Sequence, residues 1–136
     1  MMYDDVITLY NIVDDIGYRT VIKGVHIEPN TGVAVEGTGM KENDTMLCLI
    51  PLTSFEKKYI NWKDFKKLSD EEKANYFTFK NGDKIVNGEI DFEITNQKPN
   101  TIAELERNNI EVFTITNFIL RKLTNSKLNH FEITGK

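Results

Sequence analysis

The side chains able to perform acid–base or nucleophilic chemistry are few and lie far apart in the sequence. His26 and His130 are the only histidines, and Cys48 is the only cysteine. A metal centre needs several convergent ligands and a nucleophile needs a neighbouring base, and the sequence places neither beside these residues. Cys48 alternates with Met46 and Ile50, as a buried strand residue does. We therefore predict that the chain is not an enzyme and needs no metal or cofactor.

A lysine-rich segment, Thr53–Tyr76, is the candidate for a binding surface. It is the most charged part of the chain and lies between predicted strands. Several lysines on one connecting segment could contact a phosphate backbone with low specificity, and the alternative is an ordinary solvated loop. The candidate phosphate-contacting residues are Lys57, Lys58, Lys63, Lys66 and Lys67.

The same segment carries two helical patterns. Trp62, Phe65 and Leu68 recur at helical spacing, and Ser69 with Glu72 fits a capping box, in which each side chain accepts a hydrogen bond from the other residue's backbone amide. We expect two short helical turns inserted between strands. A connection of this length in a small domain is usually functional or partly disordered.

The bulk properties narrow the classes of protein. A chain of 136 residues suits one domain, 1–136, with its own core. The net charge of −4 argues against a basic face that wraps nucleic acid, because such binding depends on clustered Lys and Arg. A single cysteine fits folding in a reducing cytosol. No apolar run approaches the roughly 20 residues needed to span a bilayer, so we expect no membrane association.

The periodicity predicts a mainly β fold. Gly24 interrupts the long strand Tyr18–Ile27, which indicates a bulge or bend at which the strand changes sheet or barrel face. One helix is expected from Thr101 to about Asn108, where Thr101 and Glu104 fit a second capping box. We expect a small β-barrel or sandwich with one short helix and a long, partly helical loop. The predicted strands are Val6–Val13, Tyr18–Ile27, Val33–Val35, Thr45–Leu52, Tyr76–Phe79, Lys84–Gly88, Glu89–Thr95, Ile110–Leu120 and Asn129–Thr134.

Two details of these strands concern exposure and pairing. In Glu89–Thr95 apolar side chains alternate with the acids Glu89, Asp91 and Glu93, which predicts a half-exposed strand with a solvated acidic face. Asn81-Gly82 is a strong hairpin signal and predicts that Tyr76–Phe79 pairs with Lys84–Gly88.

The order of motifs resembles a family of small structural proteins from tailed bacteriophages and prophages, labelled minor capsid or head-tail connector proteins. The resemblance covers nearly the whole chain, with one departure at Ile27, where an aromatic residue is expected. The family is similar to the head-closure, or stopper, proteins of the phage neck. The segments that carry the resemblance are Val6–Asn11, Tyr18–His26, Asp44–Pro51, Trp62–Phe65, Gly82–Gly88, Thr101–Leu105, Phe113–Thr116 and His130–Lys136.

This resemblance implies a β-barrel that assembles as a ring, a hexamer or dodecamer, in the neck of the virion. The ring would lie below the portal and its adaptor and above the tail terminator or tail tube, and would be assembled in the cytoplasm of the bacterial host. Genomic DNA would pass through without sequence-specific binding and would be retained after packaging. In that class a loop closes the channel, and Thr53–Tyr76 with its lysines is the candidate.

Ring assembly needs one patch that meets a different patch on the next copy. Exposed strand edges could supply these contacts by extending a sheet between subunits. Two predicted edges are candidates, the acidic segment and the last strand. Their candidate interface residues are Glu89, Asp91, Glu93, His130, Phe131 and Ile133.

Two alternatives stay open. The first is a tail terminator or tail-completion protein, which is also a ring with a β-rich core and differs in its position in the virion. The second belongs to another class, a small ligand-binding β-barrel in which Tyr59, Trp62 and Tyr76 stack on the ligand.

Overall fold

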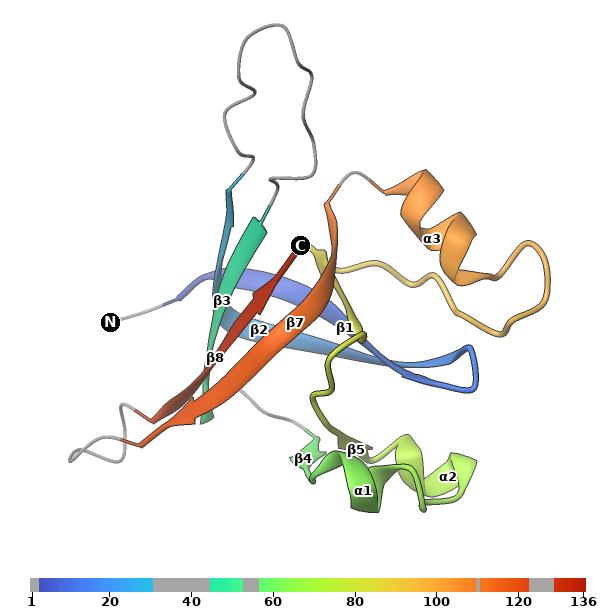
Figure 1. Ribbon diagram of the computed structural model, residues 1–136, viewed down its shortest axis with the longest axis horizontal. Helices are drawn as coiled ribbons and strands as arrows, with labels where there is room; N and C mark the ends of the chain where they lie inside the picture. Colours follow the sequence, from blue (N-terminus) through green and yellow to red (C-terminus); the bar gives the residue numbers. More distant parts are fainter. Residues whose placement is uncertain (1–2, 31–44, 53–56, 110, 123–128) are drawn as a thin grey trace, which may run out of the picture.

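Two strands, β2 (Ile16–Asn30) and β7 (Val112–Arg121), each pair with two different sets of neighbours along their length. The computed structural model describes residues 3–30, 45–52, 57–109, 111–122 and 129–136. β2 pairs first with β1 (Asp5–Val13) and then with β3 (Thr45–Pro51). β7 pairs first with β6 (Lys84–Asn87) and then with β8 (His130–Gly135). These antiparallel strands close a barrel in the order β1-β2-β3-β8-β7-β6 (Figure 1).

Each shared strand changes partner at a bulge. The register of β1 against β2 shifts between Asp5 and Val6, whose partners are Val25 and Lys23, so Gly24 is the extra residue. Gly24 has φ +76°, a left-handed conformation that glycine adopts without a side-chain clash. The predicted bend in this strand is therefore confirmed.

The second bulge reverses which side chains of β7 face the barrel. Its register against β8 shifts between Ile115 and Asn117. Before the shift Phe113 and Ile115 are buried, and after it Phe118 and Leu120 pack against the core while Ile119 is 43% exposed. Odd-numbered residues of β7 thus face the core before the bulge, and even-numbered residues face it after the bulge.

The barrel interior is filled by aliphatic and aromatic side chains from the strands and from the segment that closes one end. Cys48 is fully buried among them, and burial raises the pKa of its thiol to about 12, so it is a small core residue rather than a nucleophile. The buried cluster comprises Ile7, Leu9, Ile22, Val25, Ile27, Met46, Cys48, Ile50, Phe77, Phe79, Ile85, Phe113, Ile115, Phe131 and Ile133.

A second, smaller core covers the outer face of β1 and β6. Helix α3 (Ile102–Asn108) and the extended segment before it bring Leu105 and Ile94 against Tyr10 and Val86. The predicted helix is confirmed, and Thr101 caps it by accepting a hydrogen bond from the Glu104 amide at 3.2 Å. β1 is therefore buried on both faces along its middle.

The lysine-rich segment forms a folded cap at one end of the barrel. We call residues 57–77 the cap: β4 (Lys58–Tyr59), α1 (Trp62–Phe65), α2 (Asp70–Lys73) and β5 (Tyr76–Phe77). The two predicted helical turns are confirmed, including the capping box of Ser69 and Glu72. Phe65 is fully buried against Tyr18 with ring centroids 5.9 Å apart, so the described part of the segment packs on the β1–β2 hairpin (Figure 1).

Three predicted features of the strands are wrong. β5 pairs in parallel with β4 and not with β6, because β6 is already flanked by β1 and β7. Glu89–Thr95 is not a strand, because side chains rather than a neighbouring backbone supply most of its hydrogen bonds. β8 is not an edge, because it lies between β3 and β7. The predicted strand Val33–Val35 lies outside the described residues.

A buried hydrogen-bond network ties β1 to the chain on both sides of the Asn81-Gly82 turn. The Asn11 amide donates to the Thr78 carbonyl at 2.6 Å and to the Asp83 carboxylate at 2.8 Å, and it accepts from the Thr78 amide at 3.2 Å. Asp83 also accepts from the Ile12 amide at 3.0 Å. Asp83 is fully buried, and burial raises its pKa even though these donors and Lys80 oppose the shift.

We predict that Asp83→Asn lowers the free energy of unfolding by about 1–3 kcal/mol, because the new amide would point a donor at the donating Asn11 amide. Urea unfolding followed by circular dichroism measures the change. Asp14→Asn is the matched control, since Asp14 is exposed in the β1–β2 turn and should leave stability nearly unchanged. Equal stability of the two variants would contradict the role assigned to the network.

Candidate functional site

A hollow of about 620 Å³ separates the β1–β2 turn from the cap. Its lining combines apolar side chains with charges of both signs. Lys66 and Lys67, which immediately follow α1, are exposed on one side, and Asp14 and Asp15 are exposed on the other. The lining residues are Ile12, Val13, Asp14, Asp15, Trp62, Lys66, Lys67 and Lys80.

Trp62 and Lys80 contact each other in the lining of this hollow. The Lys80 ammonium lies 4.8 Å from the centroid of the Trp62 ring, a cation–π contact, and 3.4 Å from the buried Asp83 carboxylate. Trp62 begins α1, where Asn61 caps the helix by accepting from the Asp64 amide at 2.9 Å. The Trp62 ring is thus held between partners, since it also stacks with the Phe65 ring at a centroid distance of 6.5 Å.

The predicted lysines divide into three groups. Lys66 and Lys67 meet in the hollow, and Lys58 and Lys63 are exposed elsewhere on the cap. Lys57 is bound inside the fold: its ammonium donates to the Arg19 carbonyl at 2.8 Å and to the Thr20 hydroxyl at 3.0 Å. Burial lowers its pKa, and the nearby Arg19 adds to the shift.

Lys80 joins this lysine group although sequence reasoning missed it. It lies in the chain after the cap, in a stretch that the pattern assigned to a turn. The Asn81-Gly82 pattern predicted a hairpin turn and gave no indication that Lys80 lies beside Trp62. That contact depends on the fold, in which Asp83 bonds Asn11 and lies 3.4 Å from Lys80.

The charges around the hollow are balanced. Its lining brings three lysines together with Asp14 and Asp15, and the third carboxylate, that of the buried Asp83, lies 3.4 Å from Lys80. The exposed charges are close to solvent and are therefore screened by salt. These residues suit a reversible contact with a phosphate group rather than a tight site.

The acidic residues predicted for a subunit contact are exposed, whereas two of the residues on β8 are not. Glu89, Asp91 and Glu93 project to solvent from the segment that α3 follows. Phe131 and Ile133 are 4% and 0% exposed inside the barrel, so their side chains do not reach a neighbouring molecule.

His130 lies near the start of β8 beside an exposed pair of charged groups. Its ring nitrogen is 3.1 Å from the Glu132 carboxylate, which also lies 3.3 Å from Arg121. The bond from His130, together with Arg121, holds the pKa of Glu132 below its ordinary value. This cluster on β7 and β8 is exposed enough for solvent to screen it.

The three aromatic residues expected to stack on a ligand do not share a pocket. Tyr59 packs in the core with its ring 4.9 Å from that of Phe131 and 5.7 Å from that of Phe79. Trp62 lines the hollow, and Tyr76 lies on β5 outside it. A three-ring stacking platform is therefore wrong for this barrel.

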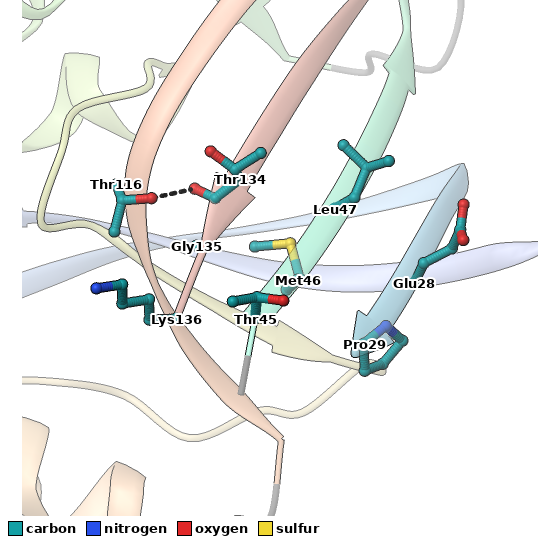
Figure 2. A pocket seen from close by; sticks show the side chains of 9 residues that line it. All are labelled: Glu28, Pro29, Thr45, Met46, Leu47, Thr116, Thr134, Gly135 and Lys136. Carbon is teal, nitrogen blue, oxygen red and sulfur yellow. Dashed lines mark hydrogen bonds between the residues drawn. The ribbon is translucent and has the colours of Figure 1, made fainter. Parts of the chain in front are cut away.

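A second hollow, of about 670 Å³, lies at the ends of β2, β3 and β8 and beside the middle of β7 (Figure 2). Glu28, Leu47 and Lys136 are spread around it, and the dashed line marks the Thr116 hydroxyl donating to the Thr134 carbonyl at 3.2 Å. Its apolar lining carries one carboxylate and one lysine side chain on different strands. No pair among its lining residues makes a nucleophile and base.

The fold and the lysine-bearing hollow define a small closed β-barrel protein with a folded cap. The chain belongs to the family described as "Family of unknown function (DUF6751)", whose pattern matches residues 2–136. Comparison with curated proteins and with solved structures found no match. Among the described residues, no helix is long and apolar enough to cross a membrane.

We predict that Lys66→Glu and Lys67→Glu together weaken binding of a short DNA duplex and reduce the slope of log affinity against log salt by about 2, about 1 per lysine lost. Trp62 is the only tryptophan of the chain, so its fluorescence reports binding in the hollow.

Lys98→Glu with Lys23→Glu is the matched control for this titration, since both lysines are exposed and lie outside the hollow. The control should keep the wild-type slope. An equal loss in both pairs would show that net charge, and not this hollow, governs the contact.

Proposed function

We propose that this protein is a structural component of the neck of a tailed bacteriophage, a head-closure connector that forms a ring and retains packaged DNA. The observation that carries the proposal is the position of the cap, which presents exposed lysines at one end of a closed barrel whose chain is acidic overall. The order of motifs that resembles the phage connector family supports the same role.

The cap suits a gate that touches DNA weakly. The exposed lysines Lys58, Lys63, Lys66 and Lys67 can meet phosphates. The bonds of Lys57 to the Arg19 carbonyl and the Thr20 hydroxyl, both on β2, anchor the cap to the barrel. A connector that conducts DNA must release it, and few screened contacts permit release. The cap would therefore contact the DNA as a folded unit held on the barrel, since Phe77 is part of the core and Tyr59 packs against it.

The ring would stand between the portal with its adaptor and the tail terminator or tube, as six or twelve copies. An acidic body would reduce adhesion of the genome to the channel wall, because like charges repel. Specific base contacts are not required for this role.

Electron microscopy of tailed particles from the bacterium that carries this gene, labelled with antibody against the chain, tests the proposal. We expect label at the junction of head and tail. Deletion of the gene should yield heads that package DNA and then lose it. If the label lies at the top of the completed tail, on the side away from the head, and if the deletion leaves full and stable heads, a tail terminator is favoured. Absence of the chain from the particles would overturn the proposal.

A further inference from the structure

Among the described residues, nothing pairs with one edge of the second half of β7. β6 pairs with β7 only as far as Thr114, whereas β8 pairs with it from Ile115 to Arg121. In a strand, the N–H and C=O groups of successive residues point to opposite edges. In β7, the residues whose side chains face the core direct their N–H and C=O groups away from β8. The Ile115 amide shows this direction before the bulge by donating to the Asp83 carbonyl at 2.8 Å.

After the bulge, the residues with this orientation are Phe118 and Leu120, which pack toward the core. In the described part of the chain, no backbone hydrogen bond joins this edge beyond Ile115 to a neighbouring segment. The edge is flanked by Ile119, 43% exposed, and ends in the exposed Arg121 and Lys122. It is thus a short strand edge with an apolar centre and a basic end.

A second open edge with the opposite charge lies on the segment from Glu89 to Glu93. On its inner side and just beyond it three carbonyls are bound: Arg19 donates to the Ile90 carbonyl at 2.6 Å, Tyr10 to the Phe92 carbonyl at 2.6 Å, and the Gly17 amide to the Ile94 carbonyl at 2.9 Å. Burial raises the pKa of Tyr10 to about 12, which keeps its hydroxyl a donor.

The carbonyls of every second residue accept hydrogen bonds on the same side of the segment. This is the two-residue period of a β-strand, although no described strand pairs with the segment. The backbone groups of Glu89 and Asp91 point the other way, and no described residue bonds them. The Glu93 carbonyl already accepts from the Asn100 side-chain amide at 2.8 Å, so the free part of this side is Glu89–Asp91. The side chains of Glu89, Asp91 and Glu93 are exposed beside that free side.

We propose that the β7 edge of one copy, Asn117–Lys122, pairs with the Glu89–Glu93 edge of a second copy. Both edges are short, and a basic end meets three carboxylates. The backbone groups available for pairing are those of Phe118 and Leu120 on β7 and those of Glu89 and Asp91 on the acidic edge. Arg121 is 52% exposed beside Glu132 and keeps further guanidinium donors for a partner. The two patches differ, so the contact is heterologous and can close a ring. This inference rests on the proposed function as a ring, and it identifies the contact between neighbouring copies of that ring.

Two variants each remove one side of this contact. Leu120→Pro removes an N–H that points to the open edge and leaves the β8 ladder intact. Glu89→Lys with Asp91→Lys and Glu93→Lys reverses the charge of the acidic edge.

Arg121→Glu with Lys122→Glu is a second variant of the β7 edge. It changes only exposed side chains and replaces the proline variant if that one does not fold. Asp4→Lys with Glu71→Lys is the control for charge, on exposed residues outside both edges.

Sedimentation velocity measures the assemblies. The wild type and the charge control should associate as concentration rises, and each edge variant alone should associate at least tenfold more weakly. An equimolar mixture of Leu120→Pro and the acidic-edge variant should form a one-to-one complex and nothing larger, because each partner keeps one intact and different edge.

Three outcomes overturn the inference: a wild type that stays monomeric to about 1 mM, an acidic-edge variant that still assembles, or a mixture that yields no complex. A symmetric β7–β7 contact would give the second outcome. These results leave the microscopy of the neck unaffected, so failure of this contact and failure of the proposed function are distinguishable.

Discussion

The barrel depends on two strands that serve both of its halves. A small closed sheet needs strongly bent strands, and β2 and β7 bend at bulges where each exchanges one neighbour for another. At Gly24 a positive φ makes the bend possible without a steric penalty. The bend in β7 instead reverses the parity of its side chains, which keeps Phe118 and Leu120 against the core.

Each partner exchange leaves a length of strand paired on one side only. For β2 the chain covers this length itself: Lys57 binds the Arg19 carbonyl, and the Gly17 amide binds the Ile94 carbonyl. For β7 no described segment takes the corresponding place beside Phe118 and Leu120. Open edges in soluble proteins are usually covered or paired. The closure of the barrel therefore produces both an anchor for the cap and the edge of β7 that we propose pairs with another copy.

Local patterns predicted the elements well and their neighbours poorly. Gly24, the Ser69–Glu72 capping box and the helix after Thr101 depend on nearby residues and were found from the sequence. The pairing of β5 with β4 depends on competition among distant strands, which overrode the Asn81-Gly82 signal. The alternation in Glu89–Thr95 correctly predicted exposed acids, but periodicity cannot distinguish a strand from an extended segment held by the side chains of Arg19 and Tyr10. Lys80 entered the lysine group only through the fold.

Amide hydrogen exchange of assembled and dilute protein tests the central claim most directly, because it reports on single N–H groups. The account predicts that the amides of Phe118 and Leu120 exchange fast in the monomer and become protected as mass increases, together with the amide of Asp91. The Ile115 amide, bonded to the Asp83 carbonyl, should be slow in both states. If the mass increases while the amides of Phe118 and Leu120 still exchange at the monomer rate, assembly of a connector through this edge is contradicted.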